Sequence, residues 1–211
     1  MARFTQGING PFKGKVGTVI GATWKGIPYM RSLPKKRMSE PSMLEMANRK
    51  KWAISQRWLK PVVDFVQIGF KGYSLKSEGF VAAKSYLLKH AFEGEAPDIY
   101  INPALVKVSF GDLPLPKTMY ITSHDGKFVH LSWDTAFSEG KAHEGDQIML
   151  VAYNIEAELA NCNLFGQLRK TGADVAKLPS SKPGIYHLYA AFIAHDRSRQ
   201  SNSIYLGSVE L

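Results

Sequence analysis

The strongest constraint on the fold is a series of short apolar runs in residues 97–211, each separated from the next by a turn signal. The runs are rich in Val, Ile, Tyr and Phe, which favour pleated, half-buried strands, and no helical periodicity interrupts them. The seven expected strands are Leu105–Phe110, Met119–Thr122, Phe128–Trp133, Gln147–Tyr153, Asn163–Arg169, Tyr186–Ala194 and Ile204–Val209. Seven antiparallel strands over about 115 residues predict an immunoglobulin-like β-sandwich.

One hairpin can be placed inside this region. Asp125-Gly126 lies between the runs Met119–Thr122 and Phe128–Trp133. An Asp-Gly pair between two apolar runs is typical of a tight hairpin turn, because both residues tolerate a positive φ. Trp133 ends the second run, and we expect it in the core of the sandwich.

Residues 39–96 predict a helical segment. Ser42 and Glu45 have the spacing of a capping box at the start of a helix. Pro61 predicts a kink or a new helix at that point, since proline cannot donate to the preceding turn. A second helix is expected over Glu78–Ala91. The apolar residues that recur at helical spacing in the first helix are Trp52, Leu59, Val63, Val66 and Phe70.

Residues 1–38 are rich in Gly and Lys and predict a β arm. Two strands are expected there, Lys15–Ile20 and Ile27–Arg31, joined through Gly21–Gly26. Pro28 restricts the second strand to a sheet edge, because it has no amide proton for the ladder. The fold class is therefore α+β, in three parts: a β arm over 1–38, a helical segment over 39–96 and a β-sandwich over 97–211.

Charge is divided unevenly along the chain, which carries a formal net charge of +9. Residues 1–89 hold 17 Lys and Arg against 4 Asp and Glu, a net +13, whereas residues 90–211 hold 10 against 14, a net −4. A basic half attracts negative charge. Three interpretations stay open: nucleic-acid binding, head-to-tail association between copies of the chain, and neutralisation within one molecule.

Motifs for catalysis or cofactor binding are not found in the sequence. The stretch Gly10–Val16 differs from a phosphate-binding loop, because three residues separate its glycines where four are needed and Val16 replaces the hydroxyl residue. The six histidines form no HxxxH or HExxH pair, and Cys162 is the single cysteine. No GxSxG nucleophile motif occurs. We expect a protein that is not an enzyme, with no cofactor and no metal.

The candidate interaction residues lie in the basic arm, where cations alternate with aromatic side chains. Cations contact phosphates and aromatic rings stack on bases, so the arm suits single-stranded nucleic acid; glycine-spaced β sequence suits docking on another subunit equally well. The residues expected at a subunit interface or a nucleic-acid surface are Gly14, Lys15, Gly17, Trp24, Lys25, Tyr29, Arg31, Lys35, Lys36 and Arg37.

Five motifs spread along the chain carry a resemblance to a known family. They are the glycine run Gly7–Gly17, Trp24-Lys25-Gly26, Arg31-Ser32, Arg57–Pro61 and Ser201–Ser208. Together they resemble a family of proteins of similar length and unknown function found in Bacteroidota. The resemblance implies that the glycine arm and the C-terminal strand belong to one shared design. It implies no catalytic or binding residues.

The leading hypothesis is a non-catalytic structural protein that self-associates into a homo-oligomer, filament or tube. The alternative is a nucleic-acid-binding protein that uses the basic N-terminal half. We expect no membrane partner, since the most apolar stretch, Pro61–Phe70, is far too short to span a bilayer. A cytoplasmic location is expected because Gly, Lys and Thr interrupt every apolar run in the first thirty residues, and export by a dedicated machine stays open.

Overall fold

The backbone forms two units, Met1–Ser42 and Met43–Leu211, in a computed structural model that describes residues 2–4, 6–7, 10–74, 76–137 and 142–211. Ile8 and Asn9 of the N-terminal glycine run lie outside the described residues. The class is α+β, as predicted, with mostly antiparallel strands in several sheets. None of the helices in the described ranges is long and apolar enough to cross a membrane.

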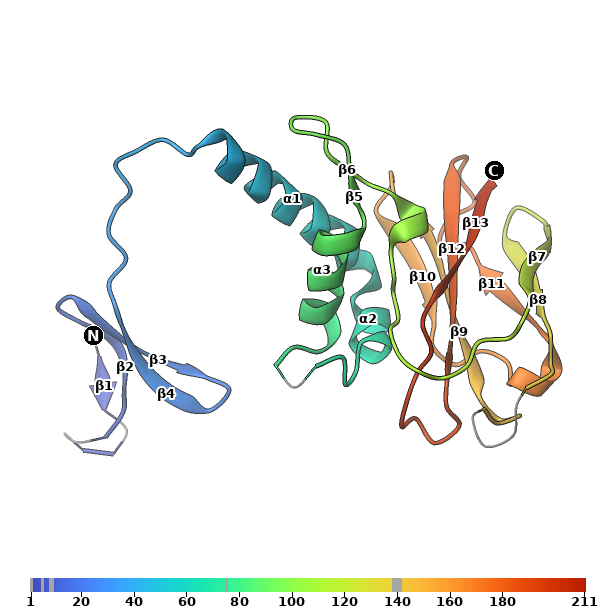
Figure 1. The fold of residues 1–211 in the computed structure, drawn as a ribbon, viewed down its shortest axis with the longest axis horizontal. Coiled ribbons are helices and arrows are strands. Elements are labelled where there is room, and N and C mark those ends of the chain that lie inside the picture. The colour runs from blue at the N-terminus through green and yellow to red at the C-terminus, as the bar shows by residue number, and fades with distance from the viewer. Residues whose placement is uncertain (1, 5, 8–9, 75, 138–141) are drawn as a thin grey trace. The chain divides into compact units, whose positions relative to one another are not determined.

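The first unit is one antiparallel sheet in which neighbouring strands follow each other in sequence (Figure 1). Its strands are β1 (Arg3–Phe4), β2 (Phe12–Val16), β3 (Val19–Trp24) and β4 (Ile27–Ser32). The prediction of one strand over Lys15–Ile20 is wrong, because Gly17 adopts a φ of 55° and turns the chain between β2 and β3. Pro28 lies in β4, which is an edge strand, as predicted.

The second unit begins with helices. Helix α1 (Met43–Leu59) starts directly after Ser42, and α2 (Val63–Gly69) continues it through a 3₁₀ turn over Lys60–Val62. Pro61 lies in that turn, so the predicted interruption is confirmed. Helix α3 (Gly79–His90) lies within one residue of its prediction at each end. A two-stranded sheet, β5 (Phe92–Glu93) with β6 (Tyr100–Ile101), follows.

Two antiparallel sheets form the rest of the unit. One has the order β10-β9-β12-β13 and the other β11-β8-β7. The predicted hairpin at Asp125-Gly126 joins β7 to β8. Their strands are β7 (Met119–His124), β8 (Phe128–Trp133), β9 (Gln147–Asn154), β10 (Leu159–Asn163), β11 (Ala173–Lys177), β12 (Ile185–Ile193) and β13 (Ile204–Glu210).

Two expected strands differ from the structure. In Leu105–Phe110, Leu105 ends a 3₁₀ turn over Pro103–Leu105, and the remaining residues lie outside any sheet. The amides of this segment bond elsewhere: Val108 N–H donates to Ser203 Oγ at 3.0 Å, and Phe110 N–H donates to the Gly69 carbonyl at 2.8 Å. In Asn163–Arg169 only the first residue is in a strand, and the chain instead forms β11 further on.

The sheet that contains β9 and β12 is the middle of three layers (Figure 1). On one face Met149, Val151 and Tyr189 pack with the core of the helices, and on the other Leu150 and Phe192 pack with β8 and β11. Almost every residue of β9 and β12 is therefore buried, which is why both read as continuous apolar runs.

Candidate interaction surface

The four-stranded sheet of the first unit has two faces of different chemistry. Residues directly opposite each other in an antiparallel sheet share a face. Lys15 lies opposite Ile20, and Ile20 lies opposite Arg31. Two further pairs lie on the same face, Ala22 with Tyr29 and Trp24 with Ile27. We call this the cationic face and define it by Lys15, Trp24, Tyr29 and Arg31.

The other face is uncharged in the described parts of β2, β3 and β4. One row holds Val16, Val19 and Ser32, the next holds Gly14, Gly21 and Met30, and a third holds Thr23 and Pro28. We call this the apolar face and define it by Phe4, Phe12, Val16, Val19 and Met30.

Phe12 and Gly21 hold the apolar face together. The Phe12 ring lies directly over Gly21, since a Cβ added at Gly21 would come within 2.7 Å of the ring and 2.1 Å of the Phe12 carbonyl oxygen. The Phe4 and Phe12 rings are 5.7 Å apart between centroids. Only glycine at position 21 leaves room for the Phe12 ring to lie on β3. The rings of Phe12 and Phe4 together form a ridge on the apolar face.

No layer among the described residues of the first unit covers either face. Among the described residues of Met1–Ser42, Gly21 alone is buried. Met30 on the apolar face is 71% exposed, and Trp24 on the cationic face is 58% exposed. A sheet of this size normally buries one face against a helix or a second sheet. The unit therefore exposes apolar area that a folded domain ordinarily removes from water.

The sheet brings together only part of the predicted site. Four residues form the cationic face, and Lys25 joins them from the β3–β4 turn, with its ammonium 5.4 Å from the centroid of the Trp24 ring. Gly14 lies on the apolar face and Gly17 in the β2–β3 turn. The remaining three, Lys35, Lys36 and Arg37, follow β4 in a segment without regular structure.

Sequence reasoning missed the apolar face. The signal for it is the turn at Gly17, which sets the alternation of Val16, Val19 and Met30 against the charged residues. In a single strand over Lys15–Ile20, Lys15 and Ile20 would point to opposite faces, whereas in the hairpin they share one face. The expected strand therefore did not reveal that one face is charged and the other apolar.

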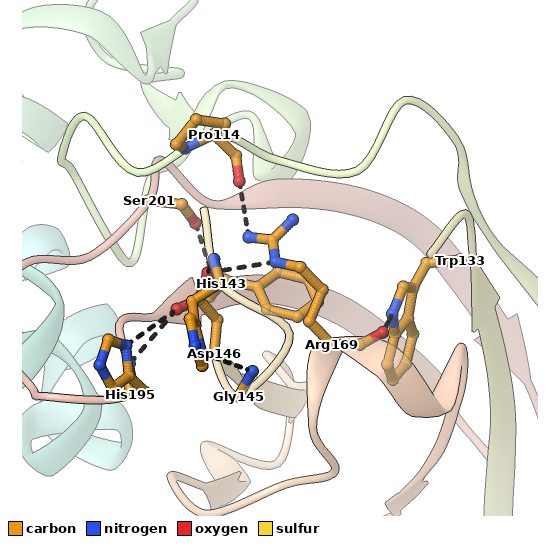
Figure 2. A network of polar contacts seen from close by, with 9 residues as sticks. Pro114, Trp133, His143, Gly145, Asp146, Arg169, His195 and Ser201 are labelled. Atoms are coloured by element: carbon orange, nitrogen blue, oxygen red, sulfur yellow. Dashed lines mark hydrogen bonds and ion pairs between the residues drawn. The ribbon is translucent and has the colours of Figure 1, made fainter. Parts of the chain in front are cut away.

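A second candidate is a buried polar network at one end of the two-sheet core (Figure 2). Arg169 and Asp146 form an ion pair at 3.2 Å, and each side chain is 1% exposed. Arg169 also donates to the Pro114 carbonyl at 2.7 Å, and its guanidinium carbon lies 4.4 Å from the centroid of the Phe192 ring. The Trp133 indole N–H donates to the Arg169 carbonyl at 2.8 Å.

The carboxylate of Asp146 accepts two backbone amides in addition to the guanidinium. The His143 N–H donates to it at 2.9 Å and the His195 N–H at 3.3 Å. Burial lowers the pKa of Arg169, and the neighbouring Asp146 carboxylate opposes that shift. These contacts join four connecting segments at one end of the two-sheet core, so we assign the network a structural role.

The thiol of Cys162 is poorly suited to nucleophilic chemistry. It lies in β10 and packs against the core shared by the helices and the middle sheet. Burial raises its pKa to about 11, and the carboxylate of Asp64 contributes to the shift. A thiol with such a pKa is almost entirely protonated at neutral pH, and the thiolate is the reactive form.

Comparison with known proteins gives one result. The family model described as "Family of unknown function (DUF6266)" matches residues 11–207. The chain belongs to this family. The match spans both units, from Pro11 before β2 to Gly207 in β13. The predicted membership of a family of unknown function is thus confirmed. No curated protein and no solved structure matches the chain significantly.

Proposed function

We propose that the chain is a non-catalytic structural protein that self-associates through its N-terminal sheet into a homo-oligomer or a filament-like assembly. The observation that carries the proposal is the uncovered sheet of the first unit, in which Gly21 alone is buried among the described residues. Removal of apolar surface from water contributes roughly 25 cal/mol per Å². A partner that covers Met30, Val16 and Phe4 supplies the missing layer.

The division of charge supports assembly beyond a pair. The cationic face and the following Lys35, Lys36 and Arg37 belong to the basic half, and residues 90–211 carry a net −4. Contacts between the basic half of one copy and the acidic half of another are head-to-tail, and such contacts polymerise when their rotation does not close. Arg31 and Lys35 are the residues that we expect to meet acidic loops.

The C-terminal strand offers a further contact. Strand β13 is an edge of its sheet and carries one charged residue, Glu210, and no proline. Edge strands without proline or inward charges readily pair with another strand. We propose that β13 pairs with a strand of a neighbouring copy.

We further propose that β7 to β13 form an immunoglobulin-like sandwich. In the constant-domain order the second strand lies between the first and the fifth, and the sixth lies between the third and the seventh. The same neighbours occur here, and the fourth strand pairs with the third instead of the fifth. The hydroxyl of Tyr186, near the start of the sixth strand, donates to the Lys182 carbonyl at 2.7 Å, as in the tyrosine corner of such domains.

The proposal of self-association is tested by deleting residues 1–42, the first unit. Light scattering measures the mass of the full chain and of the truncated chain at equal concentration. We expect a large species for the full chain and a monomer with native near-ultraviolet circular dichroism for the truncated chain. A truncated chain that folds and assembles as the full chain does would show that the N-terminal sheet is not the interface.

A second function, binding of single-stranded nucleic acid, is favoured by one observation. The cationic face presents Trp24 and Tyr29, 58% and 45% exposed, in the rows beside the one that holds Lys15 and Arg31. Exposed aromatic rings on a sheet stack on bases, at about 1–3 kcal/mol for each base, while cations neutralise phosphates. Fluorescence anisotropy with a labelled oligothymidylate tests it. Binding should weaken steeply with salt and on Trp24→Ala but not on Met30→Ala; no binding at low salt excludes this function.

A further inference from the structure

The apolar face of the N-terminal sheet is exposed, and its described strand residues are uncharged. We propose that a second copy of the chain covers it, so that two N-terminal sheets pack face to face with their cationic faces outward. This inference rests on the proposed self-association and names the interface within it. The distribution of charge and the strand edges each support a second copy.

The distribution of charge makes the apolar face the one that can oppose itself. A two-fold interface places the same patch of both copies in contact. The described side chains of β2, β3 and β4 on the apolar face are uncharged, whereas Lys15 and Arg31 lie next to Ile20 on the other face. Opposing two cationic faces would juxtapose like charges, which costs several kcal/mol. Opposing two apolar faces brings only uncharged side chains of β2, β3 and β4 together.

The edges of the sheet favour joining by a face. Strand β4 contains Pro28, which has no amide proton to donate, and β1 has two residues. Both features are known to limit pairing between strands of different chains. The sheet is therefore closed to extension at its edges and open over its apolar face.

The apolar face has a ridge at its middle row, where the Phe12 ring lies over Gly21, and a groove at its border. The rings of Phe4 and Phe12 form the ridge. The groove borders Met30; its lining includes Val19, Leu33 and Pro34 and also three cations, Arg31, Lys35 and Lys36. We place the two-fold axis between the sheets along the row Gly14–Gly21–Met30, so that the Phe12 ring of each copy, which lies over Gly21, faces the same ring of the other copy. The same axis places Met30 opposite Met30 of the second copy.

The size of the face predicts a weak pair. The four strands hold 19 residues. At about 3.3 Å along a strand and 4.8 Å between strands they cover roughly 300 Å², less than half of the ~800 Å² that each partner buries in a standard interface. We therefore expect the pair to dissociate on dilution. Larger assemblies then require a second contact, which the outward cationic faces provide.

Two substitutions in neighbouring residues of β4 test the proposal. Met30→Lys places a charge on the apolar face, and Tyr29→Lys places the same charge on the cationic face of the same strand. Sedimentation velocity over a range of concentrations measures the dissociation constant of the full chain and both variants. We expect Met30→Lys to weaken association at least about tenfold, because an unpaired charge is then buried twice, and Tyr29→Lys to leave the dimer in place.

Cross-linking gives a readout that does not depend on the stability of a lysine variant. In a Cys162→Ala background, Met30→Cys should form covalent dimers with a short bismaleimide, since packed sheets lie about 10 Å apart. Tyr29→Cys should not. If the wild type associates while neither lysine variant weakens it and Met30→Cys does not cross-link, the interface lies elsewhere and self-association stands. If Tyr29→Lys alone weakens association, the cationic face is the interface. A wild type that is monomeric at every concentration overturns both.

Discussion

The buried pair of Arg169 and Asp146 allows a quantitative test of the second unit. Replacing Arg169 by Met keeps a long apolar side chain on the Phe192 ring but removes the guanidinium. Among the described residues, the Asp146 carboxylate, 1% exposed, then keeps only His195 within salt-bridge range, 3.9 Å away and charged only when protonated. Breaking one partner of a buried pair typically costs about 3–5 kcal/mol. The two backbone amides that remain bonded to Asp146 place the expected loss near the lower limit.

The paired substitutions separate the charge effect from packing. Asp146→Asn alone leaves the guanidinium with the Pro114 carbonyl and the Phe192 ring, and we expect a loss of roughly 2–3 kcal/mol. In the double variant neither buried charge remains, and the side-chain amide introduced at position 146 keeps an oxygen for the His143 amide. The double variant should therefore be more stable than the sum of the single losses predicts, by about 2 kcal/mol.

Urea denaturation of the wild type and the three variants, followed by circular dichroism, measures these free energies of unfolding. The m-value reports whether each variant still unfolds from the same compact state. Losses below about 1 kcal/mol that simply add would contradict a buried, mutually dependent pair. The loops at the end of the sandwich would then need another explanation for their order.

Two further predictions concern protonation. Cys162 should react with iodoacetamide at pH 8 about 200-fold more slowly than a free thiol, because burial raises its pKa to about 11; mass spectrometry of native and urea-unfolded protein measures the ratio, and equal rates would refute it. Stability should fall as pH rises, since burial raises the pKa of Cys162, Tyr153 and Tyr189. Above about pH 8.5 for the thiol and about pH 10 for the tyrosines, the unfolded chain loses protons that the native state keeps. The free energy of unfolding then falls by about 1.4 kcal/mol per pH unit for each group. A urea midpoint that stays constant from pH 8 to pH 11 would contradict this.

Local chemistry accounts for the parts of the fold that the sequence predicted well. The β7–β8 hairpin depends on Asp125-Gly126, and the Asp125 carboxylate accepts the amides of Lys127 and Phe128 at 3.0 and 2.7 Å. The helix interruption depends on Pro61 alone. Both signals act within a few residues, so the turn and the helix interruption can be predicted from the local sequence.

Long-range burial accounts for the parts that the sequence did not predict. Val106 and Val108 are buried as strand residues would be, yet Val108 bonds to Ser203, 95 residues away. Arg169 looks like a surface residue in the sequence and lies in the core because Asp146 and Pro114 provide partners there. The burial of Val108 and Arg169 depends on contacts with residues far away in the sequence, which a local sequence pattern does not reveal.

The apolar face of the N-terminal sheet was hidden for a related reason. The turn at Gly17 decides that Lys15 lies opposite Ile20 and Val16 opposite Val19. A shift of the register by one residue would exchange the two faces of the strand. Once the turn is placed, Lys15 and Arg31 separate cleanly from Val16 and Met30.

Self-association through the N-terminal sheet is tested most directly by the mass of the chain in solution. Light scattering on nuclease-treated protein, at several concentrations and at low and high salt, reports whether copies associate. We expect a mass above that of the 23.5 kDa monomer, and we expect it to grow with concentration. We also expect that the apolar contact survives high salt while larger species dissociate. A constant 23.5 kDa species under all these conditions would contradict self-association through the N-terminal sheet.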